Sequence, residues 1–295
     1  MQEDVRAALD RIHKGDLIVL REIDRVCKKH KINFVIDSGT LLGAVRHKSA
    51  IPWDDDADVA MLRSDFEKFR RIAAKELKPE FQYVEPDELG NAVFDFVARV
   101  VLIDSTIRPD SEEEQYYGSG ICNRLAVDIF VIDDVSDSDL VHTLCRGLLT
   151  IVYGMGMGHR YRLNREDYTP AAWAVIRVLS AIGKHIPART IVHWYEAVSR
   201  LETGKNKQKH RVYYGNYLFG DIRQIYQKEW FVPTVEVTLD GETFPGPRNW
   251  HMCLETQYGD YMKLPPKEKQ VPNHMQPQYV QVHHPDMDRP EDKNA

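Results

Sequence analysis

The sequence predicts an α+β fold in which a mixed sheet is flanked by helices and carries a helical insertion. Two short runs rich in β-branched residues, 32–37 and 125–135, are typical of buried strands. Residues 3–30 and 64–77 instead show apolar positions at helical spacing. From 137 to about 205 the pattern is helical throughout, which predicts a separate helical subdomain.

The N-terminal half predicts a helix over 3–30, with a possible interruption at Gly15, and then the strand at 32–37. Ser38 or Thr40 can cap a short helix that ends before Pro52. The alternating run at 56–62 predicts a second strand, because alternate side chains there are apolar.

The C-terminal half predicts a long strand or hairpin arm at 91–105, helices at 137–157, 170–185 and 187–202, and a hairpin at 234–247 that turns at Asp240-Gly241. From 267 the chain is rich in Pro, Gln and His, with few apolar anchors. We therefore expect one domain over 1–266 and a disordered tail over 267–295.

Composition argues against several classes of protein. A net charge of −6 at pH 7 gives no basic excess for binding nucleic acid. The four cysteines lack CxxC spacing, which favours free thiols in a reducing cytosol over a zinc site built from scattered Cys and His. The charged N-terminus has no signal-peptide core, so we expect a cytoplasmic protein. The apolar stretches 140–158 and 171–183 predict core helices or a face that rests on the inner surface of the membrane.

Four carboxylates crowd into the five positions from Asp54 to Asp58. In a strand, Asp56 and Asp58 point to the same side, where they can share a divalent cation. Asp128 lies in the middle of the apolar strand 125–135, where a carboxylate is costly without a cation or donors. Together the three predict a site for Mg²⁺ or Mn²⁺.

Two other interpretations of these carboxylates remain open. Asp54, Asp56 and Asp58 match the first, third and fifth positions of a calcium-binding loop, but Val59 and Asp65 replace its glycine and glutamate. The carboxylates can also be helix caps and surface charges without a chemical role.

The stretch before the carboxylates suggests a phosphate site. Ser38, Gly39 and Thr40 lie where a strand opens into a helix, and the N-terminal amides of a helix attract anions. Arg46 and His47 follow and offer positive charge for a phosphate. We therefore expect these five residues to bind the substrate.

The stretch "SGTLLGAVRHKSAIPWDDDADVAM" resembles the signature of the LicD family, the bacterial phosphotransferases related to fukutin, and "VDIFVID" and residues 228–266 resemble its later motifs. The resemblance implies a nucleotidyltransferase-type fold. It also implies transfer of a phosphoalkanol group, typically phosphocholine, from CDP-choline or another CDP-alcohol to a sugar hydroxyl of a glycan or lipid-linked glycan. The family's metal carboxylates correspond to Asp56, Asp58 and Asp128, which we expect to be catalytic.

Further roles follow from this resemblance. Asp54 and Asp55 lie in the same motif, and we expect them to contact the substrate. A choline head group needs aromatic rings or a carboxylate, and we expect Tyr213, Tyr214 and Tyr217 to supply the rings. Ordinary core aromatics are the alternative.

Two other functions remain open. A nucleotidyltransferase that moves a nucleoside monophosphate would have the same acidic strands. A catalytically silent module that binds a nucleotide or lipid would need fewer carboxylates.

Overall fold

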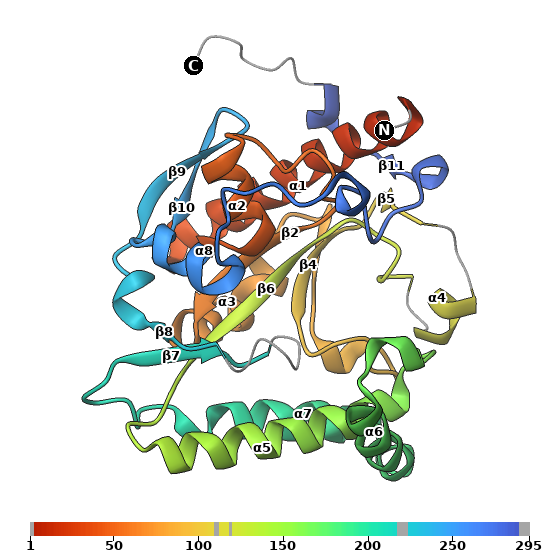
Figure 1. The fold of residues 1–295 in the computed structure, drawn as a ribbon. Helices are drawn as coiled ribbons and strands as arrows, with labels where there is room; N and C mark the ends of the chain where they lie inside the picture. Colours follow the sequence, from red (N-terminus) through yellow and green to blue (C-terminus); the bar gives the residue numbers. More distant parts are fainter. Residues whose placement is uncertain (1–2, 109–111, 118–119, 217–223, 289–295) are drawn as a thin grey trace.

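The computed structural model describes residues 3–108, 112–117, 120–216 and 224–288. Its fold is α+β, as the sequence predicts, with a curled mixed sheet flanked by helices and a layer of further helices beyond it (Figure 1). The path of the central sheet is β1 (Val35–Ile36), β2 (Ala57–Leu62), β6 (Ala126–Asp134), β4 (Ala98–Leu102) and β3 (Phe81–Val84). β7 (Arg211–Tyr214) pairs with the C-terminal half of β6 and with β8 (Tyr226–Gln227). β2 and β6 are parallel, and the other pairs are antiparallel.

Helix α1 (Glu3–His30) covers the sheet and is continuous through Gly15, so the possible interruption there does not occur. A Cβ on Gly15 would come within 2.6 Å of Leu125 Cδ1, so glycine lets the helix pack tightly there. The other helices of this part are α2 (Ser38–Arg46), α3 (Arg63–Glu76) and α8 (Trp250–Tyr258).

A second layer contains α5 (Asp139–Gly156), α6 (Pro170–Gly183) and α7 (Ala188–Ser199), and it lies below the sheet in Figure 1. Its own apolar core includes Leu149 and Ile191. The short helix α4 is Glu112–Tyr117. The 3-10 turns are Pro86–Glu88, Met157–His159, Arg165–Asp167, Arg200–Glu202, Lys228–Trp230, Lys267–Lys269, Pro277–Tyr279 and Pro285–Asp288.

The predicted strand at 91–105 is much shorter in the structure. β4 covers 98–102, and the two-residue β5 (Ser105–Thr106) follows it. Residues 91–97 are irregular, and their apolar side chains are divided: Val93 and Phe96 pack into the helical layer, whereas Val97 joins a cluster on the sheet. Phe96, for example, stacks on Tyr195 with ring centroids 3.9 Å apart.

The predicted hairpin is confirmed: β9 (Val235–Leu239) and β10 (Glu242–Gly246) pair across Asp240-Gly241, and both turn residues have positive φ. The predicted disordered tail is wrong for residues 267–288: Asp55 holds the backbone of 273–275, and 277–288 pack along α1. β11 (Gln281–Val282) pairs with β5, and Met275, Val280 and Val282 join the main core. The last part of that prediction, 289–295, lies outside the described residues.

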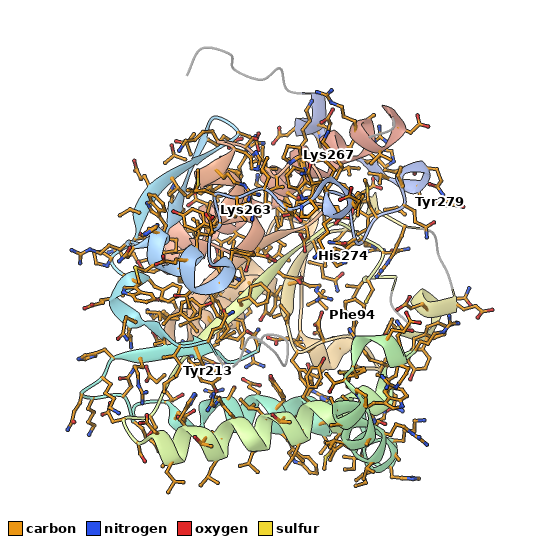
Figure 2. The ribbon with its side chains drawn as sticks, viewed as in Figure 1. Phe94, Tyr213, Lys263, Lys267, His274 and Tyr279 are labelled. Atoms are coloured by element: carbon orange, nitrogen blue, oxygen red, sulfur yellow. The ribbon has the colours of Figure 1, made fainter. Side chains whose placement is uncertain are left out.

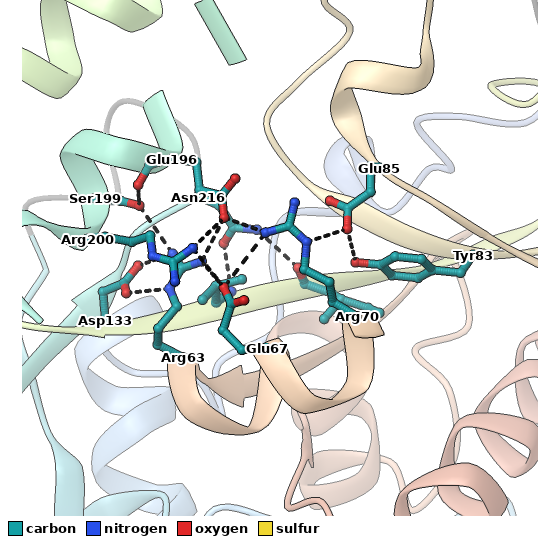
Figure 3. Close-up of polar contacts among 12 residues, drawn as sticks. Arg63, Glu67, Arg70, Tyr83, Glu85, Asp133, Glu196, Ser199, Arg200 and Asn216 are labelled. Atoms are coloured by element: carbon teal, nitrogen blue, oxygen red, sulfur yellow. Dashed lines mark hydrogen bonds and ion pairs between the residues drawn. The ribbon is translucent and has the colours of Figure 1, made fainter. Parts of the chain in front are cut away.

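A charged network ties α3 and α7 to β6 (Figure 3). The Nε and Nη2 atoms of Arg63 donate to the two carboxylate oxygens of the fully buried Asp133, at 2.7 and 2.6 Å. Arg70 bridges Glu85 and Glu196. Because each buried charge in the network meets an opposite one, it can persist away from water.

Candidate active site

The carboxylates predicted to bind metal lie on one side of the sheet. Parallel pairing of β2 and β6 places Asp58 directly opposite Asp128. Asp56 comes just before β2, and all three line one cleft of about 410 Å³. Because Asp58 and Val59 belong to a strand, the calcium-loop interpretation is wrong.

Asp58 is fixed by the start of α2. Its backbone N–H donates to Thr40 Oγ1 at 2.8 Å, and its carbonyl accepts from the backbone N–H of Asp37 at 3.0 Å. Its side chain is buried, and burial together with the charges of Asp56 and Asp128 raises its pKa well above the usual range. Thr40 therefore positions the residue of β2 that carries the Asp58 carboxylate.

Asp128 has an arginine neighbour that the sequence analysis missed. Arg99, directly across the β4–β6 pair, donates through Nε to Asp128 Oδ1 at 3.0 Å and through Nη2 to Asp95 at 2.6 Å. Burial raises the pKa of Asp128 to about 6, although Arg99 opposes this. An arginine inside the apolar run "FVARVV" was the available signal, of the same kind that identified Asp128.

Asp55 contacts the chain's own backbone. Its carboxylate accepts from the backbone N–H groups of Asn273, His274 and Met275, at 3.1, 2.7 and 2.7 Å. Asp55 thus anchors the C-terminal segment beside the cleft. This is a structural role, whereas the sequence predicted a contact with the substrate.

His274 reaches the cleft through this anchor and is labelled there in Figure 2. Its Nε2 lies 3.5 Å from Asp56 Oδ2. Across the ranges described here, Asp55, Asp56 and His274 form the one group of three whose ligand atoms lie within 4.8 Å of one another. His274 lies in the segment predicted to be a disordered tail, so the sequence did not single it out. Among the residues that the structure describes, the buried cysteines join no such group.

Gly39 lies against Asp54, since a Cβ there would come within 2.4 Å of Asp54 Oδ2. Burial and the neighbouring Asp56 raise the pKa of Asp54 to about 8. Ser38 has a φ of 49° and accepts a hydrogen bond from Gln257 at 3.0 Å. The first turn of α2 therefore faces carboxylates. Phosphate binding by Ser38, Gly39 and Thr40 stays a prediction from the sequence.

Arg46 and His47 lie at the other end of α2 and are not among the residues that line the cleft. Arg46 donates to His47 Nε2 and to the carbonyl of Tyr261. Burial lowers the pKa of both side chains. They lie at the C-terminal end of the nine-residue helix α2, and their contact with the substrate phosphate stays a prediction.

Other cations line the cleft instead: Arg108, Arg124 and Arg160, beside Arg99. The guanidinium groups of Arg99, Arg108 and Arg160 lie 5.5–5.9 Å from the ring centroid of Phe94, which Figure 2 labels below His274. The cleft is thus lined by both carboxylates and arginines, a combination that suits a phosphate ligand.

The predicted aromatic head-group site is wrong for two of its three members. Tyr213 is fully buried, donates to the carbonyl of Ser199 and lies between β7 and the helical layer (Figure 2). Tyr214 is buried in another core cluster and hydrogen-bonds with Asp37. Both faces of β7 are covered, so neither ring can meet a ligand. Tyr217 lies outside the described residues.

Comparison with known proteins gives matches over most of the chain. The family model described as "LicD/FKTN/FKRP, nucleotidyltransferase domain" matches residues 31–92, which include α2 and β2. The "Lipopolysaccharide cholinephosphotransferase LicD" of Haemophilus influenzae is 25% identical over 279 residues, which are 91% of this chain and 98% of that protein. An uncharacterized protein of Rickettsia prowazekii is 30% identical over 114 residues, 39% of this chain and 32% of that protein. One of Rickettsia typhi is 41% identical over 54 residues, 18% of each.

Proposed function

Because the chain belongs to the LicD family, we propose that it transfers phosphocholine, from CDP-choline or a related CDP-alcohol, to a sugar hydroxyl of a glycan or lipid-linked glycan. One observation supports the proposal most directly: Asp58 and Asp128 lie opposite each other on parallel strands, and both line the same cleft. The matched cholinephosphotransferase spans nearly the whole chain, so the proposal covers the whole molecule.

The donor set fits a hard divalent cation. Asp58 is buried beside two carboxylates, and across the described ranges no lysine, arginine or histidine pairs with it. Asp56, Asp58 and Asp128 would hold Mg²⁺ or Mn²⁺. When bound, the ion supplies positive charge that stabilises the phosphate oxygens and the leaving CMP.

The remaining residues bind and orient. Arg108, Arg124 and Arg160, which line the cleft, hold the phosphates of the donor. Arg99 fixes Asp128 Oδ1, which leaves Oδ2 free to face the cation and the acceptor hydroxyl. Phe94 does not serve as a choline cage, because three guanidinium groups surround its ring.

The test is thermal shift with Mg²⁺ against CDP-choline, CDP-ethanolamine, CDP-glycerol, CDP-ribitol and CTP. The true donor should raise the melting temperature of the wild type and of the exposed-site control Asp104→Ala, but not that of Asp58→Ala. If no CDP-alcohol shifts the wild type, the proposal fails.

Product analysis then separates the neighbouring functions. Phosphocholine transfer releases CMP and leaves phosphocholine on the glycan. Nucleotidyl transfer from CTP would release pyrophosphate and leave CMP on the acceptor. A silent module would bind nucleotide without either product.

A further inference from the structure

The outer face of the helical layer carries an apolar stripe that the proposed function does not use. α5 and α6 pack against each other, and they form the lower edge of the molecule in Figure 1. On α5, four large apolar side chains are 42–70% exposed: Leu140, Leu144, Leu148 and Ile151. Their spacing of three and four residues puts all four on one face of the helix.

α6 adds to this apolar surface. Val175, Val178 and Ile182 have the same kind of spacing and are about half exposed. The two helices are in close contact, because a Cβ on Gly183 of α6 would collide with the carbonyl group of Met155 in α5. Soluble proteins rarely expose so many large apolar side chains on adjoining helices without a partner.

The other side of α5 belongs to the interior of the protein. By length and composition alone, the helix over 139–159 could cross a membrane. Its inner face, however, carries the buried His142, whose Nδ1 lies 2.9 Å from Oε2 of the buried Glu202. A polar pair of this kind is costly in lipid, and Leu149 on the same face packs into the core of the layer. A bilayer can therefore meet only the outer stripe.

The charge beside the stripe favours an anionic surface. The loop over 203–211 has three lysines, one arginine and no carboxylate, in a chain whose net charge is −6. The loop is held at the start of α5, because the Asp137 carboxylate accepts from its backbone N–H groups at 207, 208 and 209, at 2.9–3.0 Å. Lys205 and Lys207 are exposed, and no carboxylate of the described residues forms an ion pair with either. Apolar side chains flanked by lysines are typical of helices that lie on anionic membranes.

We propose that the outer face of α5 and α6, together with the loop over 203–211, docks on a bilayer that contains anionic lipid. The apolar stripe enters the interface, and the lysines meet the lipid phosphates. Tyr153 and Met157, at the C-terminal end of α5 and in the turn after it, line the cleft. Docking therefore holds the cleft about 10 Å, one helix diameter, above the lipid surface.

This arrangement also narrows the acceptor, a step that rests on the proposed function. A sugar hydroxyl at that height belongs to a glycan that projects from a lipid anchor in the bilayer. A glycan free in solution would not require the enzyme to dock.

The test is sedimentation with vesicles of phosphatidylcholine, with or without about 30% phosphatidylglycerol. The wild type should bind the anionic vesicles, and more weakly in high salt. The stripe variant, Leu144→Glu/Leu148→Glu, should bind at least about tenfold more weakly, because it puts charge into the apolar surface. The lysine variant, Lys205→Gln/Lys207→Gln, should bind the anionic vesicles about tenfold more weakly, because two attractive charges are lost.

Met262→Glu/Leu264→Glu is the matched control, since both side chains are more than half exposed and lie outside the layer. It should bind vesicles as the wild type does. If the control loses binding and the stripe variant does not, docking uses another surface and the proposal is overturned. Equal binding by the wild type and the stripe variant, or no binding by the wild type, overturns it too.

Light scattering separates a second copy of the chain from a membrane. If the wild type is a dimer that the stripe variant dissociates, and neither protein binds vesicles, the face is a dimer interface and the proposal is overturned.

Docking and the proposed function can fail separately. The stripe variant should keep the wild-type thermal shift with CDP-choline and Mg²⁺, because neither substituted residue lines the cleft. Vesicle binding without a shift by any CDP-alcohol would contradict the proposed function and leave docking intact, whereas a shift without vesicle binding would do the reverse. The same melting curves show whether the stripe variant folds, and if it does not, the lysine variant on its exposed loop decides.

Discussion

Strand β6 carries two aspartates, Asp128 and Asp133, in opposite electrostatic surroundings. Five positions apart, they point to opposite faces of the sheet. Asp133 is fully buried and receives both forks of Arg63, inside a network of paired charges (Figure 3). Asp128 shares one oxygen with Arg99 and faces Asp56 and Asp58. Paired charges stabilise the fold around Asp133, whereas the carboxylates around Asp128 outnumber their positive partners, as the proposed ion site requires.

The largest expected effect is at the three neighbouring carboxylates Asp56, Asp58 and Asp128. Asp58→Ala should lower the transfer rate by about 10³-fold or more, because it removes a charge that would hold the ion. The apo protein should keep or gain stability, since one of several repelling carboxylates is gone. Transfer assays and urea unfolding, with Asp104→Ala as the control, measure the two parts. A fully active Asp58→Ala would contradict the site.

Loss of a charge from the Arg63–Asp133 ion pair should instead destabilise the fold. Arg63→Met should lower the free energy of unfolding by about 3–5 kcal/mol, because it leaves Asp133 buried without its partner. Urea unfolding measures this. The double variant Arg63→Met/Asp133→Asn should recover part of the loss, since no uncompensated charge remains. If the double variant is as unstable as the single one, packing rather than charge explains the loss.

The cluster of Asp56, Asp58 and Asp128 could largely be predicted from the sequence, because local pattern determines it. Alternation puts Asp56 and Asp58 on one face, and a single carboxylate in an apolar strand marks Asp128. The Arg63–Asp133 pair could not be predicted, because its members lie 70 residues apart and meet only through the packing of α3 on β6.

The errors have a common physical cause: composition reports side chains, while tertiary contacts decide burial. The segment after 267 has few apolar residues, yet Asp55 holds its backbone N–H groups, which no composition reveals. Tyr213 and Tyr214 look like a binding cluster in sequence, but pairing of β7 with β6 buries both.

The pH dependence of stability sharpens the comparison. Burial raises the pKa of Asp128 to about 6, and burial with the charge of Asp56 raises that of Asp54 to about 8. A carboxylate whose folded pKa lies above its unfolded value stabilises the protein at low pH, and this stabilisation is lost as pH rises through the folded pKa. In EDTA the melting temperature should therefore fall by about 5 °C between pH 4 and pH 8.

Two controls identify the source of this fall. Asp128→Asn should flatten the curve near pH 6, whereas Asp104→Ala should not. Added Mg²⁺ should stabilise the wild type more at pH 8 than at pH 5, because protons compete with the ion for carboxylates. A wild-type curve that rises from pH 5 to pH 8 in EDTA would show that these carboxylates are ionised at no cost.

The smallest expected effect is at the hydrogen bond between Thr40 of α2 and the backbone N–H of Asp58. Thr40→Val keeps the shape of the side chain but removes the acceptor for the buried N–H of Asp58. Unfolding should become easier by about 1–2 kcal/mol, and Mn²⁺ should bind more weakly because Asp58 is less well fixed. Thr40→Ser retains the oxygen and should restore both values in urea unfolding and calorimetry. If Thr40→Val weakened stability but left Mn²⁺ affinity unchanged, Thr40 would support the fold alone, and the position of Asp58 would depend on its pairing with β6.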